Sequence, residues 1–361
     1  MPYNVVMSYL EMILPFAIPP APLAKDLLRE LRVPALSCLI GKAKPDTPHH
    51  FEDFARQLPH ESLLAGHFSP GGGRIIGPPF SNSVGLESAI KSSPANTHNK
   101  MQVLGVQPVD TDMTGTSAVW FTLQPVHIHI ARDHLVLTDQ RRLTLTERES
   151  RALFAEAKII CDELGKTLVY GDTLHWFLRA DDWQGLQTAT PDAACGHNID
   201  IWMPKGEQAR PWRKLQNEIQ MQWFSHTINQ ERETQGLKPV NSAWLSGGST
   251  QLMDMPDIQK VTEFKQIDLA SKRPVLIDAL LEPALNNDWA SWLERMQLLE
   301  EHCFAPALAA LRDQQINQLN LIVTDANTLA QFSLTPWSLR QFWRKPTLHP
   351  LFSLPAQKIS N

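Results

Sequence analysis

The sequence predicts an α/β fold in which a mixed sheet is flanked by helices, with some antiparallel hairpin content. Short apolar segments of strand character alternate along the chain with segments whose apolar residues recur at helical spacing. Gly171-Asp172 separates two strand-like segments in the manner of a hairpin turn, so part of the pairing is expected to be antiparallel. With 43% apolar and 20% charged residues, the 361-residue chain has the composition of a globular protein with a large core.

The first 68 residues are expected to form an N-terminal α/β segment. Residues 13–17 are an apolar run typical of a strand, and leucines recur at helical spacing between Pro22 and Leu31. Two more helical patterns follow, at residues 34–40 and 51–65. Residues 69–115 differ in composition, since they are rich in Ser, Gly, Pro and Asn. Such a segment buries too little apolar surface to offset its ordering entropy, which predicts a flexible loop or linker.

Residues 116–361 are then expected to form the main α/β domain. Thr146 is a suitable N-cap for a helix that ends near Gly165. The other predicted helices carry apolar stripes and cover residues 211–235, 287–303, 304–311 and 337–343. The predicted strands are short and apolar or alternating, at residues 117–123, 126–130, 135–138, 167–170, 173–178, 240–246, 274–281 and 319–323. The tail from Pro350 is expected to be loose.

Polar residues suited to ligand recognition concentrate between residues 214 and 249. On one continuous helix, Glu218, Gln222, His226 and Asn229 would share a face, with Arg232 one turn further along. Such a face suits the binding of a ligand. It equally suits a buried hydrogen-bond network in which every member has a partner.

The strand predicted at 240–246 adds Asn241 and Trp244 and leads into Gly247 and Gly248. Ligands of open α/β sheets bind beyond the carboxyl ends of strands, where glycine lets the backbone approach a ligand closely. Arg232 would there supply a bidentate contact to phosphate or carboxylate. The residues alone leave a ligand site and a structural network equally open.

A histidine pair offers an alternative site for a divalent metal. His127 and His129 lie two apart on a predicted strand and so face the same side, a geometry that suits Zn²⁺ or Mn²⁺. Further ligands would have to come from Asp278, Asp325 or His302. Because no third ligand stands at diagnostic spacing, a protein without a metal cofactor is the main expectation.

Residues 224–249, FSHTINQERETQGLKPVNSAWLSGGS, resemble a segment of the archaeal-type cofactor-independent phosphoglycerate mutases, which belong to the alkaline phosphatase superfamily. The matching positions are His226, Ile228, Asn229, Arg232, Gly236, Pro239, Val240, Asn241, Trp244, Leu245 and Gly247. The resemblance implies a fold that is alkaline-phosphatase-like in part. The wider chain resembles a bacterial family named for an RpfE-type regulatory protein, through Leu58-Pro59-His60-Glu61, Trp202-Met203-Pro204, Leu215-Gln216-Asn217-Glu218 and Phe342-Trp343-Arg344.

The metal-binding elements of those mutases have no counterpart here. No Asp-Gly or Asp-Ser element follows residues 13–17, and Ala326 stands after Asp325 where a histidine is expected. Two metals would otherwise orient and neutralise the transferring phosphoryl group. The resemblance therefore implies a degenerate, non-catalytic relative with a regulatory or metabolite-binding role. A metal-dependent phosphoglycerate mutase or phosphatase with a rearranged site is the alternative.

Charge and hydropathy limit the expected partners and location. The net charge of −5 gives no basic footprint for nucleic acid, and Arg340, Arg344 and Lys345 are expected to be a solvated helix end. No apolar run reaches the ~18 residues of a membrane span. Four scattered cysteines favour reduced thiols in the cytoplasm. A phosphorylated or carboxylated small metabolite, or a protein, is the expected partner.

Overall fold

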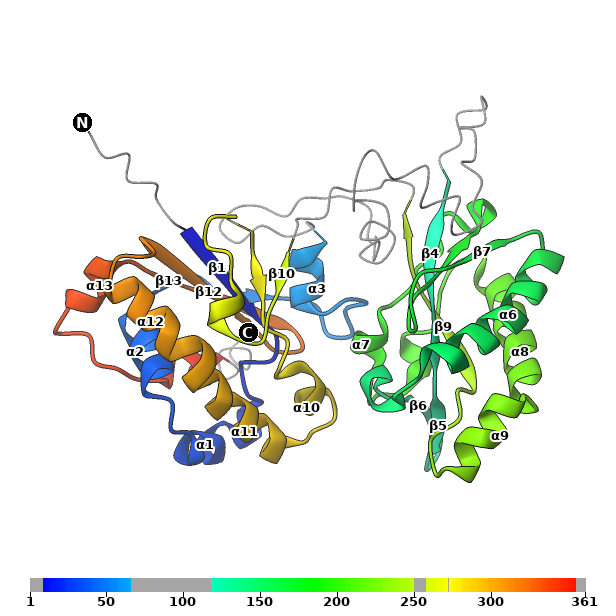
Figure 1. The fold of residues 1–361 in the computed structure, drawn as a ribbon, viewed down its shortest axis with the longest axis horizontal. Helices are drawn as coiled ribbons and strands as arrows, with labels where there is room; N and C mark the ends of the chain where they lie inside the picture. The colour runs from blue at the N-terminus through cyan, green and yellow to red at the C-terminus, as the bar shows by residue number, and fades with distance from the viewer. Residues whose placement is uncertain (1–8, 66–117, 250–257, 272, 355–361) are drawn as a thin grey trace. The chain divides into compact units, whose positions relative to one another are not determined.

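The computed structural model describes residues 9–65, 118–249, 258–271 and 273–354, which divide into two compact units. Unit 1 joins residues 9–64 to the described residues from 258 onward, and unit 2 contains residues 65 and 118–249. Both units combine a sheet with helices, so the predicted α/β class is confirmed (Figure 1). No helix in the described ranges has the length and apolar character needed to cross a membrane.

The sheet of unit 1 is mixed and has the order β10-β11-β1-β12-β13-β2, with β3 also paired to β13. Its parallel strands are β10 (Gln259–Lys260), β11 (Val275–Leu276), β1 (Tyr9–Leu14) and β12 (Gln318–Thr324). Antiparallel pairing adds β13 (Thr328–Leu334), β2 (Lys44–Pro45) and β3 (His49–His50). Met12 of β1 lies opposite Leu321 of β12, and both are fully buried, as expected for a strand covered on both faces.

The helices of unit 1 come from both parts of the chain that form it (Figure 1). They are α1 (Ala21–Glu30), α2 (Pro34–Lys42), α3 (Pro59–Leu64), α10 (Leu281–Leu285), α11 (Trp289–Leu299), α12 (Ala305–Arg312), α13 (Pro336–Arg340) and α14 (His349–Ser353). A single π turn, η5 (Glu300–Phe304), joins α11 to α12. Pro306 lacks the N–H that an uninterrupted α-helix would use at that point, which accounts for the local widening.

Unit 2 is built on a four-stranded antiparallel sheet of order β7-β8-β4-β9. The strands are β4 (Trp120–Val126), β7 (Thr167–Tyr170), β8 (Trp176–Arg179) and β9 (Ser242–Ser249), and β5 (Ile128–Ala131) pairs separately with β6 (His134–Leu137). Its helices are α6 (Glu147–Glu163), α7 (Pro191–Ala194), α8 (Ala209–Phe224) and α9 (Thr227–Thr234).

The core of unit 2 is rich in tryptophan and lies between the sheet and helices α6 and α8. Trp176 and Trp223 pack edge to face with ring centroids 5.9 Å apart, and Trp183 and Trp212 pack in the same way with ring centroids 6.2 Å apart. The Nε1–H group of Trp223 donates to the Leu153 carbonyl at 3.1 Å, which ties α8 to α6.

The two units do not follow the expected division of the chain. β1 lies between β11 and β12, so the N-terminal segment belongs with the C-terminal residues, and the expected 116–361 domain is split. The physical reason is that a buried parallel strand needs neighbours on both edges, and these come from the far end of the sequence. The linker expected at 69–115 lies outside the described residues. The tail expected to be loose from Pro350 instead contains α14.

Candidate functional site

The helix predicted from Pro211 to Gln235 is two helices, and the break falls within the expected site. α8 ends at Phe224, and α9 begins at Thr227 with His226 as its N-cap. The Nδ1 atom of His226 accepts the backbone N–H of Ile228 at 3.1 Å, which satisfies one of the free donors at the start of α9. The continuous polar face predicted from the spacing of these residues is therefore not formed.

Glu218 and Gln222 lie on the outer side of α8 and engage neighbouring side chains. The Glu218 carboxylate is 3.7 Å from the Lys214 ammonium one turn away. The Gln222 amide donates to the carboxylate of Glu156 on α6 at 2.8 Å. Both interactions are ordinary contacts of a partly solvated helix surface.

Asn229 joins three segments of unit 2 through its amide. Its Nδ2 group donates to the carbonyls of Trp223 and Val240, at 2.9 and 2.8 Å, and its Oδ1 accepts the Val240 N–H at 2.7 Å. The side chain is buried, so these bonds replace water completely. Asn229 thus fixes the end of α8 and the start of α9 to the chain entering β9.

Arg232 is fully buried (0% exposed) and is held by three acceptors. Its Nε donates to the Lys238 carbonyl at 2.8 Å, and its Nη2 to the Leu143 carbonyl at 2.6 Å. Its Nη1 donates to the Glu149 carboxylate at 3.1 Å. Burial acts to raise the pKa of Glu149, but hydrogen bonds from Thr146 and Arg232 bring the pKa below its ordinary value. The guanidinium predicted to bind an anion instead neutralises a carboxylate inside the protein.

Asn241, which directly precedes β9, and Trp244 within β9 also direct their polar groups to the backbone. Asn241 makes both bonds of a ladder with Ile128, each 2.8 Å long, and the indole N–H of buried Trp244 donates to the Ala189 carbonyl at 2.8 Å. Gly247 and Gly248 lie inside the strand, opposite a register shift in β4, and not in a loop beyond it. Because β9 pairs antiparallel with β4, the rule for carboxyl ends of parallel strands does not apply.

The two glycines of β9 are required by geometry. Gly247 and Gly248 have φ angles of 86° and 106°, which L side chains rarely adopt. A Cβ atom at Gly248 would lie 2.5 Å from Cε1 of Phe121. The Gly247 carbonyl accepts the hydroxyl of Thr188 at 2.7 Å. These glycines form a β-bulge packed against an aromatic ring.

The residues considered for a metal are divided between the two units. His127 and His129 belong to unit 2, and their rings stack with centroids 6.1 Å apart. Their Nδ1 atoms lie 2.8 Å from the Pro239 carbonyl and 3.2 Å from the Thr138 hydroxyl. Burial is the main cause that lowers the pKa of both histidines, and the nearby Lys238 ammonium lowers both pKa values further. For His127, a hydrogen bond to the Pro239 carbonyl acts in the opposite direction. That ammonium also opposes binding of a cation.

The aspartates considered for the metal belong to unit 1 and have local partners. The Asp278 carboxylate lies 2.7 Å from the Lys260 ammonium. The Asp325 carboxylate accepts the N–H groups of Asn327 and Thr328, at 2.8 and 2.6 Å, and so closes the turn from β12 to β13. His302 is exposed on η5. In the described ranges, no three or more His, Cys, Asp or Glu side chains are grouped so that they could hold a metal ion.

The carboxyl end of β1 is filled by apolar packing. Phe16 follows the strand with a φ of 57°, and its carbonyl accepts the indole N–H of Trp292 at 2.9 Å. Its own N–H points at the hydroxyl of Thr324, the last residue of β12, at 3.4 Å. Phe16 and Trp292 are both buried. Two buried aromatic residues therefore lie next to this end of β1, which is where α/β proteins commonly hold a ligand.

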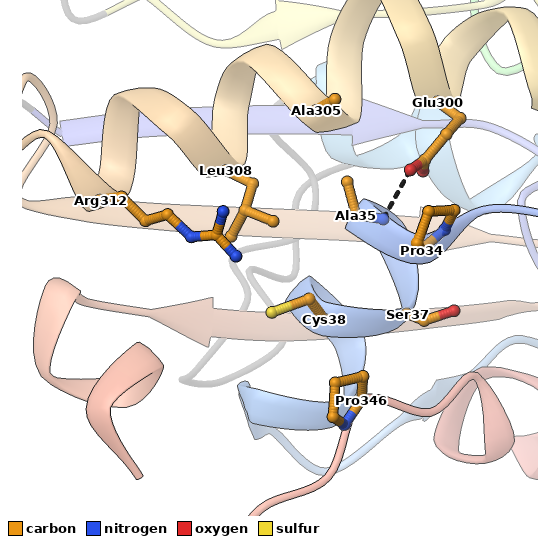
Figure 2. A pocket seen from close by; sticks show the side chains of 9 residues that line it. All are labelled: Pro34, Ala35, Ser37, Cys38, Glu300, Ala305, Leu308, Arg312 and Pro346. Carbon is orange, nitrogen blue, oxygen red and sulfur yellow. Dashed lines mark hydrogen bonds between the residues drawn. The ribbon is translucent and has the colours of Figure 1, made fainter. Parts of the chain in front are cut away.

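A pocket of about 590 Å³ lies on another face of unit 1, between α2 and the η5–α12 helix (Figure 2). Its lining residues are Pro34, Ala35, Ser37, Cys38, Glu300, Ala305, Leu308, Arg312 and Pro346. The Glu300 carboxylate closes one end, where it accepts the N–H groups of Ala35 at 2.5 Å and Leu36 at 3.0 Å. Because Pro34 at the start of α2 has no N–H, these are the first donors of that helix.

Arg312, in the last turn of α12, forms the other end of this pocket. Its guanidinium extends from α12 toward α2, above Cys38 and beside Leu308 (Figure 2). The side chain is exposed, and within the described ranges it makes no hydrogen bond or ion pair. Sequence reasoning missed this residue because Arg312 and α2 are distant in the chain. The sequence carried a signal only for Glu300: Val33 and Pro34 give the start of α2 no side-chain cap, so its first N–H donors require an acceptor from elsewhere.

Comparison with known proteins gives structural neighbours at low similarity. No family model matches the sequence, and no curated protein matches it. One similar solved structure is a cofactor-independent phosphoglycerate mutase from Thermoplasma acidophilum, with 13% identity, 95% of this chain and 94% of that chain covered, and a TM-score of 0.36. Another is the PH0037 protein from Pyrococcus horikoshii, with 12% identity, 91% and 87% covered, and a TM-score of 0.43. A phosphoglycerate mutase is thus among the neighbours, and nothing in these comparisons bears on the RpfE-type family.

Proposed function

We propose that this protein is a non-catalytic, metabolite-binding regulatory protein and that its ligand binds in the pocket between α2 and α12. The observation that carries the proposal is the exposed guanidinium of Arg312, which has no hydrogen-bond or ion-pair partner among the described residues, at the edge of a pocket of about 590 Å³. Small-molecule sites typically enclose roughly 300–1,000 Å³ and combine apolar walls with a few polar groups that orient the ligand. The pocket has a volume in this range and this mixture of groups, and it is open to solvent.

The lining of the pocket favours a small metabolite with one anionic group. Arg312 offers a planar fork of donors that matches a phosphate or carboxylate. Ala35 and Leu308 provide an apolar wall for the body of the ligand. The Glu300 carboxylate repels a second anionic group at the opposite end, so a monoanionic or singly phosphorylated ligand is favoured over one charged at both ends.

Two further observations support a non-catalytic role. The polar residues of the mutase-like segment, Asn229, Arg232 and Asn241, are used to hold unit 2 together. Buried Phe16 and Trp292 are joined by a hydrogen bond next to the carboxyl end of β1. The alternative, a metal-dependent phosphoglycerate mutase or phosphatase, would require Mn²⁺ or Zn²⁺ ligands from two units and a cation beside Lys238.

Thermal unfolding and calorimetric titration with glycerol 3-phosphate, glycerate and glycerol test the proposal. We expect glycerol 3-phosphate or glycerate, each with one anionic group, to raise the Tm, because a ligand that binds the folded state stabilises it by mass action, and we expect glycerol to have no effect. Arg312→Ala should weaken binding by about tenfold or more, equivalent to the ~1.4 kcal/mol of a charge-assisted hydrogen bond. Arg213→Ala, an exposed arginine of α8, is the matched control and should bind as the parent does.

Three outcomes would contradict the proposal. The first is that neither anionic compound binds. The second is that the Arg312→Ala and Arg213→Ala variants bind equally well. The third is stoichiometric Mn²⁺ or Zn²⁺ binding together with mutase turnover that is lost in a His127→Ala or Asp325→Ala variant, which would establish the enzymatic alternative.

A further inference from the structure

Three large aromatic side chains face solvent in a short segment of unit 1. Trp337 is 63% exposed, Phe342 is 86% exposed and Trp343 is 62% exposed. Trp337 lies on α13, and the other two follow that helix and pack edge to face, with ring centroids 5.1 Å apart. Single exposed apolar residues are common on proteins, but a cluster of large aromatic rings is typical of a surface that binds a partner.

The backbone beneath these aromatic residues is held firmly. The Lys42 ammonium at the end of α2 donates to the carbonyls of Leu339 and Gln341, at 2.9 and 3.2 Å. In return, Nη1 of Arg344 donates to the carbonyl of Ala43 at 2.6 Å, so two cations cross-link α2 and the aromatic segment. A surface fixed in this way loses little conformational entropy when a partner binds.

The charged residues within the aromatic segment are all positive. Residues 337–345 contain three cationic side chains and no acidic one, in a chain whose net charge is −5. Arg340 and Lys345 are exposed, whereas Arg344 is half-buried and engaged with α2. The segment is thus a local positive surface on an acidic protein, which suits a partner of negative charge.

We propose that Trp337, Phe342 and Trp343, with Arg340 and Lys345, form a docking surface for an acidic peptide segment of a partner protein, one in which Asp or Glu flanks apolar residues. Tryptophan and arginine are the residues that contribute most often to the energetic centre of protein interfaces. The two exposed cations would gain only about 1 kcal/mol each at an anionic membrane, while the net charge of −5 opposes approach of the whole chain to that extended negative surface. A short acidic peptide carries only a few charges, so the net charge of the protein repels it less than it repels an anionic membrane.

The test is selection of binders from a displayed random-peptide library with the full-length protein, followed by fluorescence titration of a synthetic enriched peptide. Enriched sequences should carry acidic residues beside apolar ones. Phe342→Ala and Trp343→Ala should each weaken binding of the synthetic peptide by about tenfold or more. Arg340→Ala should weaken binding by a smaller factor, and this effect should disappear at high salt. Phe224→Ala, which removes an equally exposed ring from α8, should bind as the parent does.

Specific results would overturn the docking surface. These are enrichment of basic or uncharged peptides, or equal binding by the Phe342→Ala and Phe224→Ala variants while both retain the parental Tm. Tighter binding to phosphatidylserine vesicles or to a single-stranded oligonucleotide, lost in the same variants, would assign the surface to a membrane or to nucleic acid. Self-association that Phe342→Ala abolishes would assign it to a second copy of this chain. Because none of these residues lines the Arg312 pocket, either proposal can fail without the other.

Discussion

Arg232 brings a full positive charge into the interior of unit 2, where its five donors depend on groups of the protein alone. Glu149 balances the charge, and the carbonyls of Leu143 and Lys238 take two further N–H groups. Glu149 in turn accepts the N–H of Thr146 at the start of α6. A single side chain therefore links the start of α6, the end of α9 and the chain before β9.

We predict that Arg232→Ala destabilises the protein by about 3–5 kcal/mol, because it leaves the Glu149 carboxylate buried without its partner. Urea unfolding followed by tryptophan fluorescence measures this change. Arg148→Ala is the matched control, since Arg148 is exposed and pairs at the surface with Glu231. That variant should unfold at the same urea concentration as the parent. Equal stability of the two variants would contradict the structural role of Arg232.

Lys238 is expected to control the titration of the neighbouring histidines. The pKa values of His127 and His129 lie below the ordinary 6.5 because of burial, with Lys238 adding to the effect. Lys238→Ala should therefore raise both pKa values toward 6.5, as followed by NMR of the imidazole protons at low ionic strength. Lys214→Ala, which removes an exposed lysine of α8, should leave them unchanged. Unchanged values in both variants would disprove the electrostatic coupling.

The lowered pKa values of His127 and His129 also determine how these two residues make the stability of the protein depend on pH. Because these histidines bind protons less readily when folded than when unfolded, the unfolded chain takes up more protons as the pH falls below about 6.5. Their contribution to stability is therefore complete above that pH and decreases as the pH is lowered toward the folded-state pKa values.

At the scale of the element, β9 owes its path to two glycines at positive φ. Gly248→Ala would place a Cβ atom 2.5 Å from the ring of Phe121 in a backbone conformation that already disfavours a side chain. We predict a loss of about 2–4 kcal/mol, the sum of backbone strain and overpacking. Gly165→Ala at the end of α6 separates the two effects, because Gly165 has a φ of 67° but open space around it. Calorimetric melting should show a clearly larger loss of Tm for Gly248→Ala than for Gly165→Ala, and equal losses would refute the overpacking.

At the scale of the whole molecule, unit 2 has a complete core of its own, whereas unit 1 needs both ends of the chain. The apolar core of unit 2 comes entirely from residues between Val119 and Leu245. β1 lies between β11 and β12, which both belong to the C-terminal part of the sequence. The division of the chain into two units therefore follows from which strands pair with one another in each sheet.

We therefore predict that a fragment of residues 118–249 folds alone, with the near-ultraviolet circular dichroism of packed tryptophans and a cooperative thermal transition. A fragment of residues 9–64 should show neither property, because β1 has lost both of its neighbours. A non-cooperative 118–249 fragment would contradict the independence of unit 2.

Local sequence patterns predicted most helices and strands, but they could not predict contacts between residues that are far apart in the chain. Thr146 as the cap of α6 and the hairpin at Gly171-Asp172 depend on neighbouring residues. The cap and the antiparallel pairing of β7 with β8 are confirmed, but the connection covers residues 171–175 and not two residues alone. The break at His226 was missed because the polar spacing continues across Ser225. The pocket was missed because Glu300 and Arg312 reach α2 from more than half the chain away. For the polar face from Glu218 to Arg232, the sequence leaves a ligand site and a buried polar network equally open. The hydrogen bonds of Asn229 and Arg232 favour the network, and these bonds are visible only in the structure.

Hydrogen exchange of the full-length protein with and without saturating glycerol 3-phosphate tests the central claim most directly. The claim is that ligand recognition belongs to the Arg312 pocket of unit 1 and that the mutase-like segment of unit 2 is structural. We predict that the ligand slows exchange at the start of α2 and along α12, with no change between His226 and Gly248. Protection of residues 226–248, or no protection anywhere, would contradict it.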